Sequence, residues 1–70
     1  MDFNLREGED FIKLGQLLKA ANLVSSGVDA KIEIQEGKVY VNGEVCTMRG
    51  KKLYSGDTVR YMDKAINIIG

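Results

Sequence analysis

The hydrophobic pattern of this chain changes its period near the middle, and no other feature constrains the fold as strongly. Between residues 11 and 21, apolar side chains recur at the spacing of one helix face, at Phe11, Leu14, Leu17, Leu18 and Ala21. From residue 38 onward, apolar and polar side chains alternate, which is the period of a β-strand. We therefore predict an α+β fold, with two N-terminal helices packed on a small, mainly antiparallel sheet of four to five strands.

The first helix is expected to open at Glu9 and Asp10, with Asp10 as its N-cap, because acidic side chains favour the positive end of a helix dipole. Asn22 is the expected stop. Gly15 lies inside this helix, where glycine costs about 1 kcal/mol relative to alanine. We therefore expect another backbone segment to pass close to Gly15.

A second helix is predicted from about residue 27 to residue 36. Ser26 is the expected N-cap, Asp29 returns a bond to it in a weak capping box, and Gly37 ends the helix in a left-handed conformation. Two apolar pairs are each one turn apart, and one of them should face the core: Ala30 with Ile34, or Val28 with Ile32.

The remaining segments are predicted to be strands. Asn42-Gly43 stands between two alternating runs, which is a strong signal for a tight hairpin. A further turn is expected at Asp63-Lys64. The predicted strands cover residues 3–5, 39–41, 44–46, 58–62 and 65–69, and residues 53–54 form a further apolar segment.

Length and composition limit the class of protein. Seventy residues, 44% of them hydrophobic and 29% charged, suit one globular domain spanning residues 1–70. No apolar run approaches the roughly 20 residues of a membrane helix, and the N-terminus has no secretory pattern. Cys46 is the only cysteine and histidine is absent, which fits a cytoplasmic protein and excludes the usual zinc sites. We expect no cofactor, no metal and no membrane partner.

The residues give little support to catalysis. No histidine is present, and Cys46 has no activating neighbour in the sequence. Ser25 and Ser26 have no nearby base and are better explained as helix caps. Neither Gly50 nor Gly56 has the spacing of a phosphate-binding loop. We therefore predict that the protein is not an enzyme.

Charge is distributed unevenly although the net charge is zero. Residues 1–36 carry four cations and seven acids, a net charge of −3, whereas residues 37–70 carry six cations and three acids, a net charge of +3. Arg49, Lys51 and Lys52 cluster around Gly50 within four positions. Such a cluster suits an anionic polymer, and Lys31 and Lys38 could extend it. On the cations alone, an ordinary solvated loop is the favoured interpretation.

The order of motifs adds a family resemblance. The pattern LxxLLKxxxLVSSGxxAKxxIxxGxVxVNG, followed by the basic loop and by LYSGDTV, resembles the S-four RNA-binding domain. The likeness covers residues 11–61 and is greatest to the small, free-standing bacterial members of that family. The resemblance implies a non-catalytic, cytoplasmic protein that contacts the phosphate backbone of structured RNA. Ribosomal RNA, in ribosome assembly or translation, is the implied partner, and DNA is not expected.

The resemblance also assigns roles to individual positions. Ser26 and Lys31 on the second helix match helix contacts of the family. Lys38 and Asn42 match positions at the start and end of the first hairpin strand. Arg49, Lys51 and Lys52 match the basic loop. The implied RNA-binding residues are Ser26, Lys31, Lys38, Asn42, Arg49, Lys51 and Lys52.

Two alternatives belong to other classes of protein. The segments VNGEV, GDTV and AINIIG are similar to parts of the ubiquitin-like sulfur carriers, which act through a terminal Gly-Gly, whereas Gly70 here follows Ile69. A protein-interaction adaptor that uses the acidic first half of the chain is the second alternative.

Overall fold

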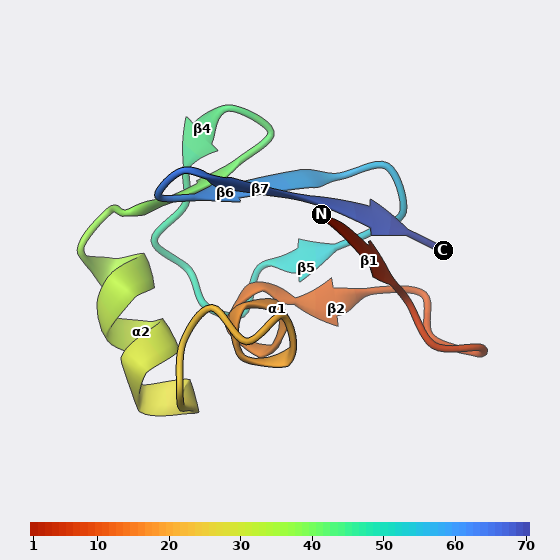
Figure 1. Ribbon diagram of the computed structural model, residues 1–70, viewed down its shortest axis with the longest axis horizontal. Coiled ribbons are helices and arrows are strands. Elements are labelled where there is room, and N and C mark those ends of the chain that lie inside the picture. The colour runs from red at the N-terminus through yellow and green to blue at the C-terminus, as the bar shows by residue number, and fades with distance from the viewer.

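Two helices and seven strands make up the computed structural model, which describes residues 1–70 (Figure 1). The elements in chain order are β1 (Asp2–Asn4), β2 (Ile12–Lys13), α1 (Leu14–Ala20), α2 (Gly27–Gln35), β3 (Val39–Val41), β4 (Glu44–Val45), β5 (Lys52–Leu53), β6 (Thr58–Tyr61) and β7 (Lys64–Ile69).

The strands form one mixed sheet of five strands and a separate pair. The five-stranded sheet has the order β1-β7-β6-β3-β4, in which β1 runs parallel to β7 and the other neighbours are antiparallel. Strands β2 and β5 pair with each other beside α1 (Figure 1). The predicted α+β class is confirmed. The helices are not the first elements, however, because β1 and β2 precede them.

The sequence predicts the turn of the first hairpin correctly and that of the second hairpin one residue too late. Asn42 and Gly43 have φ angles of 51° and 86°, the left-handed pair that a two-residue hairpin turn requires, so the predicted hairpin is confirmed. The later turn is displaced from its predicted position by one residue. It lies at Met62-Asp63, with φ of 57° at Met62, and Lys64 is already the first residue of β7.

The first helix starts later than predicted, and Asp10 is not its N-cap. The residues before Leu14 are extended because β2 pairs with β5, which is distant in sequence. Lys13 is the N-cap residue, and its N–H donates to the side-chain oxygen of Gln16 over 3.4 Å. The predicted stop is confirmed, since α1 ends at Ala20 and Asn22 is left-handed at φ 61°.

The second helix has the predicted start and N-cap and ends at Gln35, one residue before the predicted end. The Ser26 hydroxyl accepts a hydrogen bond from the Asp29 N–H over 3.2 Å. The Asp29 carboxylate accepts from Ser25 Oγ over 2.5 Å, so the predicted return bond to Ser26 is replaced by a neighbouring one. Gly37, at φ 77°, follows the C-cap Glu36 and ends the helix as predicted.

The core lies between the helices and one face of the five-stranded sheet. Ala30 and Ile34 are the buried pair of α2, whereas Val28 and Ile32 are 68% and 48% exposed. The other sheet face, here called the outer sheet face, is open to solvent and includes Tyr40. The twelve buried residues are Leu14, Leu17, Leu18, Ala30, Ile34, Val39, Val41, Leu53, Val59, Tyr61, Ile66 and Ile68.

A hydrogen-bonded network ties α2 to the sheet. The Tyr61 hydroxyl donates to Glu33 over 2.5 Å, and Lys38 Nζ lies 3.1 Å from carboxylate oxygens of both Glu33 and Glu36. The hydrogen bond from Tyr61, followed by that from Lys38, lowers the pKa of Glu33. The same bond to Glu33 raises the pKa of Tyr61, and both carboxylates raise the pKa of Lys38.

Replacing Tyr61 by phenylalanine should make stability less dependent on pH. The lowered pKa of Glu33 contributes stability above its ordinary value of 4.5, and that contribution is lost as pH falls. The raised pKa of Tyr61 contributes below its ordinary value of 10.0, and that contribution is lost as pH rises. The difference in unfolding free energy between wild type and Tyr61→Phe should therefore peak at about pH 5–9. Urea denaturation across pH measures it, and a difference that is constant with pH would contradict the expectation.

Candidate nucleic-acid interface

A basic groove lies where the starts of both helices meet the loop between β4 and β5. Its volume is about 410 Å³, and no hydrophobic or acidic side chain lines it. Three of the lining residues are cations: Lys13 and Lys19 belong to α1 and its N-cap, and Arg49 belongs to the loop between β4 and β5. The residues of the basic groove are Lys13, Gly15, Gln16, Lys19, Gly27, Arg49 and Gly50.

Backbone hydrogen bonds hold the loop against the start of α1. The N–H of Leu14 donates to the carbonyl of Lys51, and the N–H of Gly15 donates to the carbonyl of Arg49, both over 2.9 Å. The loop thereby supplies acceptors to helix N–H groups that have no partner within the helix. The prediction that another backbone passes close to Gly15 is confirmed. Because this loop is fixed at two points, the Arg49 side chain is presented from a defined backbone position.

The first helix contributes groove residues that are absent from the predicted site. Lys13, Gln16 and Lys19 are three residues apart and therefore lie on one side of α1, opposite its buried leucines. Their three-residue spacing on the polar side of the helix is the sequence signal that could have identified them as site residues. Their proximity to Arg49 depends on the pairing of β2 with β5, which no local pattern reveals.

Several predicted site residues lie at or beside the basic groove. Arg49 lines it directly, and Ser26 immediately precedes the lining residue Gly27. Lys31 is exposed one turn beyond Gly27 and therefore lies on the same side of α2. Lys52 is the cross-strand partner of Lys13. These positions bring four cations and one hydroxyl into or beside the basic groove, where Lys19 is a fifth cation.

Lys51 does not line the basic groove. It lines a separate hollow of about 330 Å³ beneath the first hairpin, together with Asn42 and Glu44. Its carbonyl, by contrast, accepts the helix N–H described above, so its backbone helps to fix the loop.

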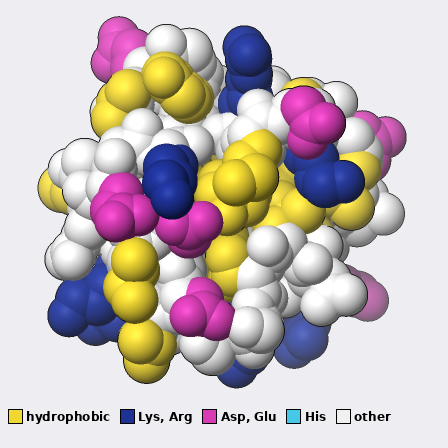
Figure 2. Space-filling view, turned by 60° about the vertical axis from the view of Figure 1, so that its left-hand side comes forward, with side chains coloured by type: hydrophobic (Ala, Val, Ile, Leu, Met, Phe, Trp, Pro, Cys, Tyr) yellow, Lys and Arg dark blue, Asp and Glu magenta, His cyan; other side chains and the backbone are white.

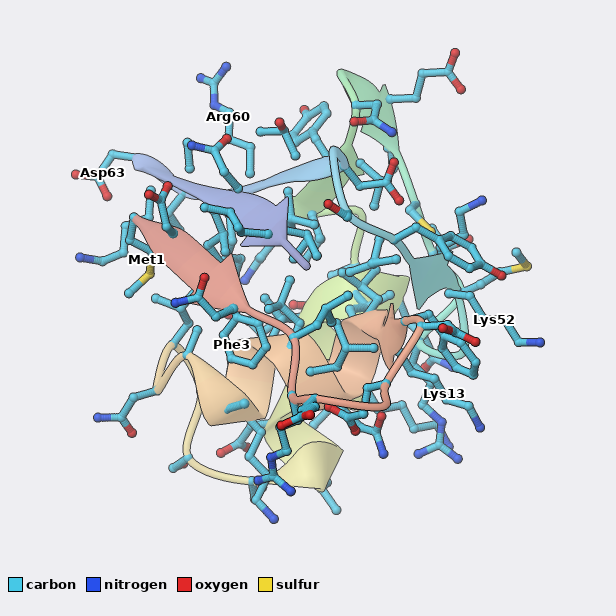
Figure 3. All side chains as sticks on the ribbon, turned by 90° about the vertical axis from the view of Figure 1, so that its right-hand side faces the viewer. Met1, Phe3, Lys13, Lys52, Arg60 and Asp63 are labelled. Carbon is cyan, nitrogen blue, oxygen red and sulfur yellow. The ribbon has the colours of Figure 1, made fainter.

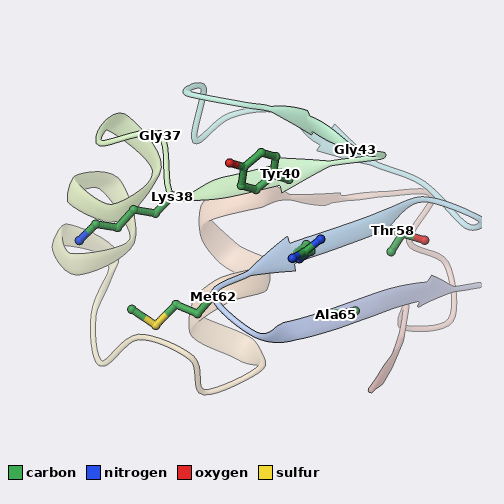
Figure 4. A pocket seen from close by; sticks show the side chains of 8 residues that line it. Gly37, Lys38, Tyr40, Gly43, Thr58, Met62 and Ala65 are labelled. Carbon is green, nitrogen blue, oxygen red and sulfur yellow. The ribbon is translucent and has the colours of Figure 1, made fainter.

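Lys38 and Asn42 already have partners within the protein. Lys38 forms the two ion pairs of the network on α2 and lines a hollow of about 660 Å³ on the outer sheet face (Figure 4). The Asn42 amide donates to Asp57 over 3.1 Å, and its oxygen accepts from the Thr58 N–H over 2.9 Å. RNA would have to displace these partners, so their role as RNA contacts stays a prediction.

Charges elsewhere on the surface are mixed. On the side where α2 and β4 come forward, hydrophobic, cationic and acidic side chains are interspersed (Figure 2). The paired Lys38, Glu33 and Glu36 belong to this part of the surface. Positive charge on this side is therefore neutralised by nearby carboxylates and attracts an anionic ligand weakly. All charged side chains that line the basic groove are cations.

No helix in the structure has the length and apolar character needed to cross a membrane. The chain also contains no group of three or more histidine, cysteine or acidic side chains arranged to hold a metal ion. Cys46 is a free, half-buried thiol whose Sγ lies 3.7 Å from the carbonyl oxygen of Met48.

Together, the fold and the basic groove define a class: small α+β domains in which two helix starts and one loop form a cationic surface. The family model of the S4 domain matches residues 3–69, and the chain belongs to that family. This membership confirms the resemblance to the S-four RNA-binding domain.

Relatives of the chain are small bacterial proteins. "Probable ribosome maturation protein RlbA" of Bacillus subtilis (strain 168) is 48% identical over 50 residues, which cover 71% of this chain and 70% of RlbA. YbcJ of Escherichia coli (strain K12) is 36% identical over 58 residues, 83% of each chain. The solution structure of YbcJ superposes with a TM-score of 0.72 at 33% identity and covers 99% of this chain and 86% of its own. It is described as revealing an alfaL motif involved in RNA-binding.

Proposed function

We propose that this protein is a non-catalytic RNA-binding protein that contacts the phosphate backbone of structured RNA through its basic groove. The observation that carries the proposal is the convergence of Lys13, Lys19 and Arg49 on one hollow without an acidic neighbour. The descriptions of YbcJ and RlbA support RNA as the polyanion. On this proposal, residues 1–70 form one RNA-binding unit.

The chemistry of binding follows from the groove residues. Lysine and arginine side chains displace condensed counterions from the RNA backbone, and this release supplies much of the affinity. The Ser26 hydroxyl accepts from the Asp29 N–H and keeps its own proton to donate to a phosphate. Lys31 and Lys52 would extend the contacts along the RNA. Bases of an RNA duplex lie in a deep, narrow groove, so shape and phosphate position are recognised in place of sequence.

Ribosomal RNA is the proposed target, in ribosome assembly or in translation. The support comes from RlbA, whose name refers to ribosome maturation. This role places the protein in the cytoplasm, where a single unpaired thiol such as Cys46 stays reduced. The sulfur-carrier alternative has no comparable support, because the family model that matches the chain is that of the S4 domain.

A salt series tests the proposal. Binding of the wild-type protein to a structured ribosomal RNA fragment is measured by fluorescence anisotropy at several salt concentrations. Four or five phosphate contacts should give micromolar binding and a slope of about −3 to −4.5 in log K against log salt. Absence of binding at low salt, or binding that does not change with salt, would contradict a phosphate-contacting groove.

A further inference from the structure

An aromatic pair lies beside the basic groove and has no role in the proposed phosphate contacts. The rings of Phe11 and Tyr54 have centroids 5.9 Å apart and are tilted by 52°. Ile12 of β2 and Leu53 of β5 are cross-strand partners. Phe11 comes directly before Ile12 in the chain, and Tyr54 comes directly after Leu53. The small two-stranded sheet therefore brings together two rings from distant parts of the chain.

The aromatic pair is continuous with the cationic surface. Lys13 lines the basic groove and is the cross-strand partner of Lys52, whose ammonium lies 4.9 Å from the centroid of the Phe11 ring. Figure 3 shows Lys13 and Lys52 projecting near each other on one side of the molecule. A ligand that follows the groove past Lys13 therefore meets Lys52 first and then the aromatic pair.

Tyr54 presents an accessible ring from a fixed backbone. Its N–H donates to the Asp57 carboxylate over 2.8 Å, and its carbonyl accepts from the Asp57 N–H over 3.0 Å. The side chain is 48% exposed, and its hydroxyl makes no hydrogen bond within the protein. Phe11 is half-buried and packs against the Tyr54 ring. Neither ring belongs to the buried core, so the fold does not need Tyr54 at this position as core filling.

These features suit an unpaired nucleotide. A base offers a flat π face that stacks on an exposed aromatic ring, and a neighbouring lysine can hold its phosphate. Bases inside a duplex are stacked on one another and cannot reach such a ring. We propose that Tyr54, supported by Phe11 and flanked by Lys52, stacks an unpaired base that adjoins the duplex in the basic groove. The preferred ligand is then a junction between double-stranded and single-stranded RNA.

This inference rests on the proposed function, and two RNAs separate the tests of the two ideas. One is a blunt RNA duplex, and the other is the same duplex with a short single-stranded overhang. The first overhang nucleotide carries a fluorescent adenine analogue whose emission is quenched by stacking. The wild type should bind the junction about fivefold or more tightly than the blunt duplex, with quenching on binding.

Two tyrosine variants locate the effect. Tyr54→Leu should remove the preference for the junction while changing affinity for the blunt duplex by less than about twofold, because phosphate contacts remain. Tyr40→Leu is the matched control, since Tyr40 is similarly exposed, at 40%, but lies on the outer sheet face. It should keep the full preference.

Each alternative outcome is decisive. Equal binding of both RNAs by the wild type overturns the stacking inference and leaves the proposed function intact. Failure to bind either RNA overturns both. Circular dichroism shows whether Tyr54→Leu is folded. If it is not, the wild-type protein alone decides: a fluorescent adenine analogue that is not quenched when the wild type binds overturns the stacking inference. An unchanged preference in folded Tyr54→Leu also overturns it and leaves the ring as cover for the two-stranded sheet.

Discussion

Ile34→Ala is expected to lower the free energy of unfolding by about 2–5 kcal/mol. Ile34 is fully buried on α2, where the helix faces the sheet, and its truncation removes apolar contacts and leaves a cavity. A domain of this size has a total stability of about 3.5–10 kcal/mol, at 0.05–0.15 kcal/mol per residue. The variant should therefore be close to unfolding, as measured by a large shift in the urea midpoint.

The matched control is Ile32→Ala, on the same helix. Ile32 is 48% exposed, so the same deletion removes fewer contacts and leaves no enclosed space. Its effect should stay below about 1 kcal/mol, given that surface substitutions usually change stability by about 0.5 kcal/mol or less. Equal losses in the two variants would mean that α2 does not pack through Ile34.

Reversing two charges in the basic groove should weaken RNA binding by about 100-fold or more at low salt. In Lys13→Glu/Arg49→Glu, two phosphate contacts are lost and two repulsive charges replace them. The field at the groove changes sign locally, while both side chains are exposed and make no contact within the core. Fluorescence anisotropy with the same ribosomal RNA fragment measures the change.

Arg60→Glu/Lys64→Glu controls for net charge. It also takes the net charge from zero to −4, but Arg60 projects from the outer sheet face, far from Lys13 in Figure 3. Its binding should fall by much less, roughly tenfold at most, because only the long-range field changes. Equal losses in both variants would place the RNA elsewhere or show that only net charge matters.

Much of the fold follows from local sequence. Period and capping residues predicted α2 with its cap Ser26, and the Asn42-Gly43 hairpin was predicted because only a few residue types accept a left-handed turn. The start of α1 was misplaced because acids at Glu9 and Asp10 look like a helix opening. The segment after them instead pairs with β5, forty residues away, and only tertiary structure supplies that strand.

The candidate site was predictable to a similar extent. The cations of one loop are adjacent in sequence, so Arg49 and Lys52 stood out as part of a cluster, and the family resemblance then assigned them to RNA binding. Lys13 and Lys19 were not found, because their place in the groove depends on hydrogen bonds between Gly15 and the loop backbone. Lys38 was predicted as an RNA contact from its place in the sequence. The sequence did not show that its ammonium forms ion pairs with Glu33 and Glu36.

The parallel pairing of β1 with β7 has a consequence for the order of folding. Asp2 lies opposite Asn67, so this contact closes a loop of nearly the whole chain, and its entropic cost is the largest in the fold. Strand β1 has no neighbour other than β7, which is itself held in a hairpin with β6. We therefore expect β1 to dock only after the hairpin of β6 and β7 has formed, because its docking joins the two ends of the chain.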